Sequence, residues 1–311
     1  MGIILFLCSI SELLLPSGIQ ILKDNKCKKE QISLGFELSP NAKINNNASG
    51  LLEKSGYNYF YLKNINSTEV LSNFITLLSE NKLFSAKKGN GPTNLMRLVL
   101  NDLNGNDSPL VNLTIGITGS ISETKIVNMV NTIPPALISN SNNYYKLDRV
   151  MGKHIFRGEE NFIANISPPP FSEDFCAFLV FIKLMNNRNL KVKFSPETAP
   201  SPFIIYVSDN KIRNITIKPK RKEIKKAISD VSNWINTLSL MQNRSRFMIL
   251  YYSMGVEQNT FENWLKELKK LQYKDIEKVW KKYLFDGFVA SLDSNSIKIL
   301  KKLFPESNIV E

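Results

Sequence analysis

The chain has 311 residues, of which 43% are hydrophobic and 22% are charged, and its formal net charge is +12. At roughly 100–200 residues per domain, this length predicts two domains that bury their cores without disulfide staples. One histidine and three cysteines exclude the usual ligand set of a catalytic zinc. Most of the positive excess lies after residue 147, which favours an anionic partner without choosing among nucleic acid, lipid and protein.

Cysteine and histidine are too scattered to form a metal site. Cys8, Cys27 and Cys176 share no C-x-x-C spacing and leave one cysteine out of any disulfide. Cys176 is surrounded by apolar residues, which is typical of a small core residue with a raised pKa. His154 lies within an expected strand, where a structural role is the usual one. We therefore expect no metal and no cofactor.

An apolar run opens the chain, from Met1 to Cys8. It is too short for a membrane span, which needs about 20 apolar residues, and no cationic segment precedes it. We interpret residues 1–12 as a truncated export signal, and a buried first strand or helix and a lipid-anchored Cys8 are the alternatives. An extracytoplasmic or periplasmic location is the corresponding expectation, and a cytoplasmic location stays open.

The first half of the chain alternates strand patterns with helix patterns. Strands are predicted at 13–22, 31–38 and 113–117, and helices at 68–83 and 94–102. Ser120 and Glu123 have the spacing of a capping box and predict a further helix, which Pro134 ends. Polar, turn-rich residues at 136–150 predict the boundary between two lobes.

The second half repeats this order of elements. Strands are predicted at 153–157, 161–167, 190–194, 203–207, 212–218 and 287–292, and helices at 171–185, 222–240, 261–268 and 276–284. The helix at 171–185 is apolar almost throughout, which indicates that it is buried on most sides.

Four stretches, taken in their order along the chain, resemble the insulinase/pitrilysin (inverzincin) metallopeptidases. They are Leu15–Leu22 (LPSGIQIL), Gly56 onward with the helix Thr68–Leu83, Asn112–Gly119 with Ser122-Glu123, and Leu271–Leu292. Together they cover about a third of the chain and occur in both lobes. None is a catalytic motif, so the resemblance rests on their order.

The catalytic motif of that family is H-x-x-E-H on a helix, where two His bind zinc and the Glu is the general base. The resemblance places this helix between the second strand and Leu51. Here only Asn41–Gly50 occupies the interval, as an expected loop, and no H-x-x-E-H occurs in the sequence. The resemblance therefore implies a degenerate homologue without the zinc site, and no catalytic residue is carried over.

The second half of that family often has an Arg and a Tyr that steady the substrate. Tyr206 matches the Tyr and is a candidate remnant substrate-side residue, although no Arg precedes it with the usual spacing.

Between Lys211 and Lys226, eight positive charges accompany a single carboxylate, Glu223. Such a run is able to bind phosphates or anionic headgroups, and a solvated junction between a strand and a helix is the alternative. Aromatic residues that would stack bases are missing from it. The candidate anion-binding residues are Lys218, Lys220, Arg221, Lys222, Lys225 and Lys226.

The expected fold is α+β with two similar lobes, residues 13–147 and 148–311, each an antiparallel or mixed sheet with helices packed on one side. The resemblance implies a non-catalytic structural or partner subunit, bound to a zinc-bearing homologous subunit or to a peptide or protein ligand. An independent module for anionic lipid or polyanion, using residues 211–226, is the alternative, and an enzyme of unrecognised chemistry is a third. Sequence-specific binding of nucleic acid is not expected.

Overall fold

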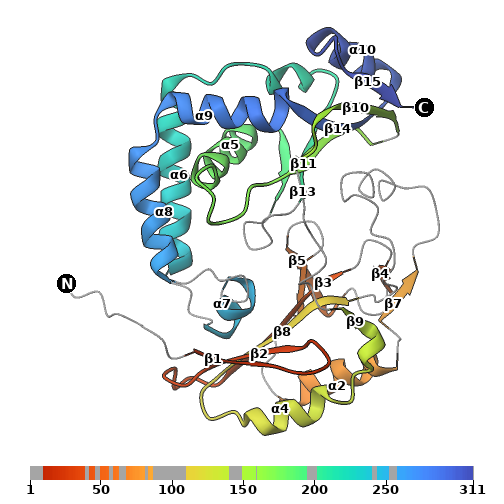
Figure 1. Cartoon of the computed structure of the whole chain (residues 1–311), viewed down its shortest axis with the longest axis vertical. Helices are drawn as coiled ribbons and strands as arrows, with labels where there is room; N and C mark the ends of the chain where they lie inside the picture. The colour runs from red at the N-terminus through yellow and green to blue at the C-terminus, as the bar shows by residue number, and fades with distance from the viewer. Residues whose placement is uncertain are drawn as a thin grey trace. The chain divides into compact units, whose positions relative to one another are not determined.

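A computed structural model describes residues 10–38, 42–45, 50–55, 59–62, 68–80, 83–86, 110–139, 149–158, 160–194, 202–239, 244–251 and 258–310. The chain divides into two compact units (Figure 1). The first takes in Met1–Gly89, Leu103–Tyr145 and Met241–Gln258, and the second takes in Asn90–Asp102, Lys146–Leu240 and Asn259–Glu311. The expected helix at 94–102 and most of the expected lobe boundary lie outside the described residues. No helix in the described part is both long and apolar enough to cross a membrane.

The first unit is built on a mixed sheet with strand order β1-β2-β8-β3-β6-β5, in which β9 also pairs with β8. Its strands are β1 (Ile10–Leu14), β2 (Gln20–Asp24), β3 (Gln31–Leu38), β5 (Leu52–Ser55), β6 (Tyr59–Leu62), β8 (Leu110–Thr118) and β9 (Ile138–Ser139). A separate pair is formed by β4 (Ala42–Ile44) and β7 (Phe84–Ala86). The helical segments are α2 (Thr68–Ser79), α4 (Glu123–Val130), the short η1 (Pro135–Leu137) and α7 (Arg244–Leu250).

The single strand predicted at 13–22 is wrong, because the structure has a hairpin there. The amide of Gly18 donates to the carbonyl of Leu15 at 2.8 Å, and the amide of Leu15 donates to the carbonyl of Ile19 at 2.9 Å. Gly18 has a φ of 87°, which a residue without a Cβ adopts readily. The turn therefore separates β1 from β2, which pair antiparallel.

Helices α2 and α4 cover one face of this sheet (Figure 1). Leu34 of β3 lies opposite Ile115 of β8, and both are fully buried in one cluster with Phe74 of α2 and Ile126 of α4. The capping box predicted from Ser120 and Glu123 is wrong, because Ser122 is the N-cap and accepts from the amide of Lys125 at 3.3 Å. The side chain of Ser120 instead donates to the carboxylate of Glu30.

Helix α7 packs on the opposite face of the sheet (Figure 1). In the sequence, more than half of the second unit lies between β8 and this helix. Ser33 and Gly116 are the small residues beneath it: the Ser33 hydroxyl lies 2.8 Å from that of Ser245, and a Cβ on Gly116 would lie 2.4 Å from the Ser245 carbonyl oxygen. The Arg244 guanidinium pairs with the buried Asp24 carboxylate at 2.9 Å. The sheet thus has helices on both faces.

The second unit has a mixed sheet with strand order β12-β13-β11-β14-β10-β15. The strands are β10 (Gly152–Arg157), β11 (Phe162–Ile166), β12 (Lys191–Lys193), β13 (Pro202–Tyr206), β14 (Gly287–Leu292) and β15 (Asn308–Val310). The helical segments are α5 (Phe175–Asn187), η4 (Ile212–Ile215), α6 (Arg221–Ser239), α8 (Gln258–Lys270), α9 (Tyr273–Trp280), the π-helical turn η6 (Lys281–Phe285) and α10 (Ser294–Leu303). Two mixed sheets with helices confirm the predicted α+β class.

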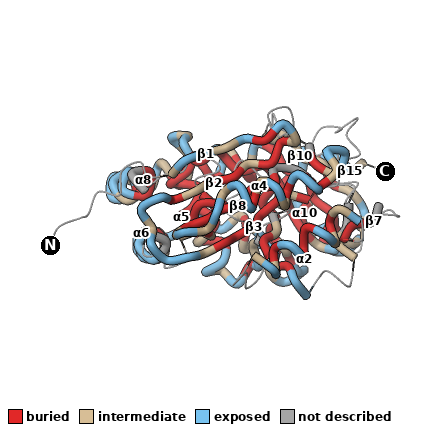
Figure 2. Tube along the Cα trace, turned by 90° about the horizontal axis from the view of Figure 1, so that it is seen from below, coloured by how far each residue is buried: buried red, intermediate tan, exposed pale blue. Residues whose placement is uncertain are grey.

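Helix α5 forms the centre of this unit. Ten of its residues are buried (Figure 2), as its near-continuous apolar sequence predicts. The Phe178 ring lies 5.1 Å, centroid to centroid, from both Phe203 of β13 and Tyr283 of η6. Burial raises the pKa of the Tyr283 phenol well above its usual range. Aromatic edge-to-face contacts therefore join α5 to the sheet and to the turn after α9.

Helix α9 is amphipathic and buries Ile276, Val279 and Trp280. The Trp280 indole donates to the Ile215 carbonyl at 2.9 Å and its ring lies 5.2 Å from that of Phe285. Helix α9 packs on α5, and η6 continues to the sheet. Removing a buried indole therefore leaves both a cavity and an unsatisfied carbonyl.

We predict that Trp280→Ala lowers the free energy of unfolding by about 3–5 kcal/mol, the range for a large buried aromatic. Lys281→Ala is the matched control, because this neighbouring side chain is exposed, and it should change stability by no more than about 0.5 kcal/mol. Urea denaturation of both variants measures the difference. Equal small losses would show that α9 is not packed as described.

Candidate functional site

The basic segment at 211–226 is a turn followed by a helix. The strand predicted at 212–218 is wrong, since Ile212–Ile215 forms η4. Ile212 and Ile215 are both fully buried. A spacing of three brings them to one side of a 3₁₀ turn, whereas residues three apart in a strand lie on opposite faces. Helix α6 then begins at Arg221, close to the predicted start.

Arg188, at the C-terminus of α5, holds this segment in place. Its guanidinium donates to the carbonyl of Asn214 at 3.1 Å and to that of Ile217, and it pairs with Glu223 at 3.3 Å. The Glu223 carboxylate also accepts from the backbone amide of Lys220 at 2.7 Å. This amide and, after it, Arg188 lower the pKa of Glu223. The one carboxylate of the run is therefore engaged by the fold.

Lys218 connects the segment to α9. Its ammonium lies 2.8 Å from the Glu277 carboxylate, and this hydrogen bond raises the pKa of Lys218. The lysine side chain is 72% exposed, so solvent screens the pair and it contributes little to stability. Its importance is positional, because it places α9 beside the start of α6.

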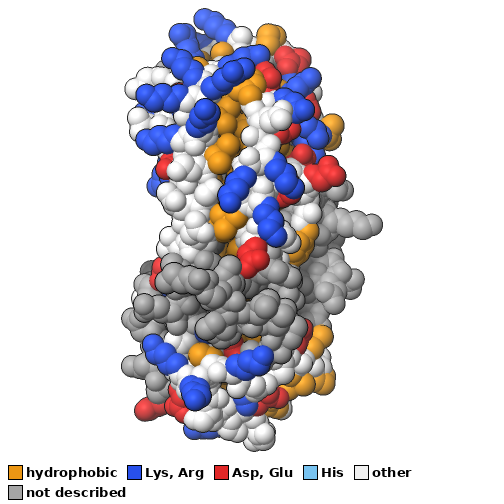
Figure 3. Space-filling model, turned by 90° about the vertical axis from the view of Figure 1, so that its left-hand side faces the viewer, with side chains coloured by type: hydrophobic (Ala, Val, Ile, Leu, Met, Phe, Trp, Pro, Cys, Tyr) orange, Lys and Arg blue, Asp and Glu red, His pale blue; other side chains and the backbone are white. Residues whose placement is uncertain are grey.

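Of the remaining candidates, Lys220 is exposed just before α6 and the other four are exposed on its first two turns. Arg221, Lys222, Lys225 and Lys226 form no ion pair among the described residues. Residues four apart lie one above the other on a helix, so 221 and 225, and 222 and 226, share its outer face. Figure 3 shows Lys and Arg side chains gathered over the upper part of the face that α6 and α8 present, on both sides of a hydrophobic band.

Tyr206 lies apart from this group, at the end of β13. The Lys191 and Lys193 ammoniums of the edge strand β12 lie 5.7 and 5.0 Å from the centroid of its ring, and the Phe162 ring lies 6.3 Å away. The register that pairs Lys191 with Tyr206 brings these groups together. Sequence reasoning missed both lysines, because nothing in the sequence shows which strands pair.

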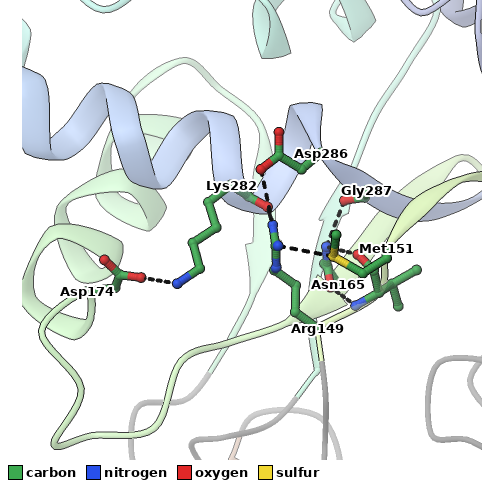
Figure 4. A network of polar contacts seen from close by, with 8 residues as sticks. Arg149, Met151, Asn165, Asp174, Lys282, Asp286 and Gly287 are labelled. Atoms are coloured by element: carbon green, nitrogen blue, oxygen red, sulfur yellow. Dashed lines mark hydrogen bonds and ion pairs between the residues drawn. The ribbon is translucent and has the colours of Figure 1, made fainter.

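A polar network, also missed from the sequence, joins the start of β10 to η6 and α5 (Figure 4). Arg149 donates to the Lys282 carbonyl and pairs with Asp286 at 3.4 Å. Lys282 pairs with Asp174, just before α5. The buried Asn165 side chain donates to the Gly287 carbonyl at 2.7 Å and accepts from the amide of Val150. Each polar side chain of this network is therefore held by a partner within the second unit.

The single histidine and the buried cysteine of α5 both contact backbone carbonyl oxygens. The His154 Nε2 lies 3.1 Å from the Met151 carbonyl oxygen. Cys176 is buried on α5, with its thiol 3.8 Å from the Trp264 carbonyl. Burial raises the pKa of the Cys176 thiol to about 12, with a smaller contribution from Glu267. Among the described residues, no group of three or more His, Cys, Asp or Glu side chains could hold a metal ion.

We predict that Cys176 resists alkylation by iodoacetamide at pH 8 in the native protein, because a buried thiol with a pKa of about 12 is not ionised there. The half-buried Cys27 should be modified first. Peptide mass spectrometry separates the two sites, and denaturant should make both reactive. Equal modification rates in the native protein would contradict the packing of α5.

The depressed pKa of Glu223 predicts a pH dependence of stability. A carboxylate whose pKa is lower in the folded state stabilises the fold above its ordinary pKa of 4.5, and this contribution is lost as pH falls through the folded value. Glu223→Gln should therefore lower the melting temperature at neutral pH, and the gap from the native chain should close below pH 4.5. Glu262→Gln, at an exposed position on α8, is the control, for which the melting temperature should match that of the native chain at each pH. A gap for Glu223→Gln that persists unchanged in acid would contradict the assigned contacts.

No family model and no curated protein matches the sequence. Among solved structures, the chain is similar to a peptidase M16 inactive domain from Pseudomonas fluorescens, with 12% identity, 92% of this chain and 98% of that chain covered, and a TM-score of 0.47. A chain of complex III2 from Candida albicans matches with 11% identity, 93% and 99% coverage and a TM-score of 0.49. A predicted insulinase family protease from Yersinia pestis matches with 11% identity, 96% coverage of each chain and a TM-score of 0.47.

Proposed function

We propose that this chain is a non-catalytic subunit of the insulinase/pitrilysin type, which assembles with a zinc-bearing homologue. The observation that supports this most directly is the interval between β3 and β5. In the family that the sequence resembles, the zinc helix occupies this place. Here Ala42–Ile44 forms strand β4, which pairs with β7, so the loop expected over 41–50 is a strand in this part.

The chemistry of the residues agrees with this proposal. Two histidines one helical turn apart and a glutamate between them are needed to bind zinc and activate water. The sequence contains neither that motif nor a second histidine. The buried Cys176 cannot replace them as a nucleophile, because its thiol stays protonated at neutral pH.

The partner follows from the resemblance. In that family two half-size chains often face each other across a chamber, and one of them can lack the zinc motif. This chain would then supply part of the chamber wall, with Tyr206 and its two neighbouring lysines as a candidate surface for a peptide. In a simpler variant of the same proposal, the chain binds a peptide or protein ligand directly and has no second subunit. The location that goes with this proposal is extracytoplasmic or periplasmic, as the apolar run at the start of the chain suggests.

Affinity purification of the full chain from its native source tests the proposal. We predict that a homologous chain containing H-x-x-E-H copurifies in a fixed ratio. We also predict that the isolated chain contains well under one equivalent of zinc and does not cleave unstructured peptides.

The copurified complex should hydrolyse such peptides, lose this activity to a chelator and regain it with added zinc. The isolated chain is the matched control under the same conditions. Stoichiometric zinc in the isolated chain, or chelator-sensitive hydrolysis by it, would overturn the non-catalytic assignment. Purification without any H-x-x-E-H chain would overturn the assignment of the partner.

A further inference from the structure

A continuous basic surface extends over two helices of the second unit, beyond the run that the sequence shows. The ion pair between Lys218 and Glu277 and the hydrogen bond from Trp280 to Ile215 bring α9 beside the start of α6. Glu277 lies three residues after Lys274 of α9 and four before Lys281, the first residue of η6, so these two exposed lysines lie on the same side as Glu277. The α6–α9 basic surface consists of Lys218, Lys220, Arg221, Lys222, Lys225, Lys226, Lys274 and Lys281.

The carboxylates of this region are engaged within the fold, whereas most of its cations are not. Glu223 is bound by Arg188 and by the Lys220 amide, and Glu277 is bound by Lys218. Asp275 accepts from the amide of Gln272 at 2.8 Å, as part of the cap of α9. Within the described ranges, no ion pair involves the four cations on the first turns of α6, Lys274 of α9 or Lys281 at the start of η6, whereas Lys278 of α9 pairs with Asp174 at 3.7 Å. The net charge of this surface is therefore strongly positive.

The placement of these cations also opposes the local electrostatics of the helix. Arg221 and Lys222 lie in the first turn of α6, where the helix macrodipole is positive and favours anions. A bound anionic surface would relieve this repulsion. The repulsion between these two cations and the positive end of the helix would therefore weaken when an anion binds.

An exposed apolar side chain distinguishes this surface from a plain polyanion site. Ile217 is 51% exposed and lies next to Lys218 in the chain. Tyr273, the first residue of α9, is half-buried and close enough to Lys218 to raise its pKa. Cations around an apolar residue and a tyrosine are typical of surfaces that lie in a membrane interface. Sites for single-stranded nucleic acid typically stack successive bases on several aromatic rings, whereas residues 211–226 contain no aromatic residue and Tyr273 adds a single ring.

We propose that the α6–α9 basic surface binds the headgroup layer of a membrane rich in anionic lipid, with Ile217 inserted between the headgroups. The cations would contact lipid phosphates and carboxylates. This inference does not depend on the subunit role proposed above, because it concerns an outer surface of the second unit.

Flotation of the full chain with lipid vesicles tests the inference. We predict binding to vesicles of phosphatidylcholine mixed with phosphatidylserine and none to vesicles of phosphatidylcholine alone. Binding should weaken as salt shortens the screening length to about 8 Å at physiological ionic strength. Each lost cation should lower the partition coefficient about fivefold, so Lys222→Glu/Lys225→Glu should lower it at least about 25-fold.

The matched control is Lys298→Glu/Lys302→Glu, an equal change of charge at two exposed positions of α10. It should keep more of the binding than the α6 variant, although both chains have the same net charge. An acidic side chain at position 222 suits the first turn of the helix, and position 225 is exposed. The α6 variant should therefore melt close to the native chain, and this separates lost binding from lost folding. Equal losses in the two variants, or equal binding to both kinds of vesicle, would overturn the proposal.

Ile217→Ser distinguishes lipid from other polyanions. It should weaken binding to the anionic vesicles and leave binding to a single-stranded oligonucleotide unchanged. Lys274→Glu/Lys281→Glu should weaken vesicle binding as the α6 variant does, which tests the contribution of α9. If Ile217→Ser has no effect on vesicles and the oligonucleotide binds more tightly than they do, the surface is a polyanion site and the membrane proposal is wrong.

Discussion

The close packing of α7 on the first sheet is the contact on which the architecture of the first unit depends. Gly116 permits this approach, since any Cβ there would meet the Ser245 carbonyl oxygen at 2.4 Å. The buried Asp24 carboxylate would be costly alone and is neutralised by Arg244. The Gln31 side chain accepts from the first amide of α7 at 2.8 Å, which satisfies one of the free donors of a helix start.

The sequence predicts elements well where one pattern dominates. The apolar run of α5 and the strand of Gly287–Leu292 are found as expected, because both are buried and their side chains leave no alternative. Predictions fail where a few polar residues decide: Gly18 turns the chain within an apolar stretch, and Ser122 caps α4 where Ser120 has the better motif. The sequence of α7 has no distinctive apolar pattern. The helix is positioned by its tertiary contacts instead.

The candidate site shows the same limit. A count of residues identifies the positive run, but the sequence does not show which charges are paired. Arg188 lies 35 residues from Glu223, and Lys218 lies 59 residues from Glu277, so neither pair has a local signal. The contribution of Lys274 and Lys281 to the basic surface is visible only once α9 is placed beside η4 by the Trp280 indole. The two lysines beside Tyr206 likewise depend on strand register.

The return of the chain to the first unit has a consequence for synthesis on the ribosome. The sheet of that unit can form once β9 has emerged, but α7 is translated only after roughly a hundred further residues, or about 5–20 s at ordinary elongation rates. During this interval the face with Ser33 and Gly116 lacks its helix, and Asp24 lacks its cation. One face of the nascent first unit therefore stays uncovered while most of the second unit is synthesised. This is the stage at which a chaperone would find a surface to bind.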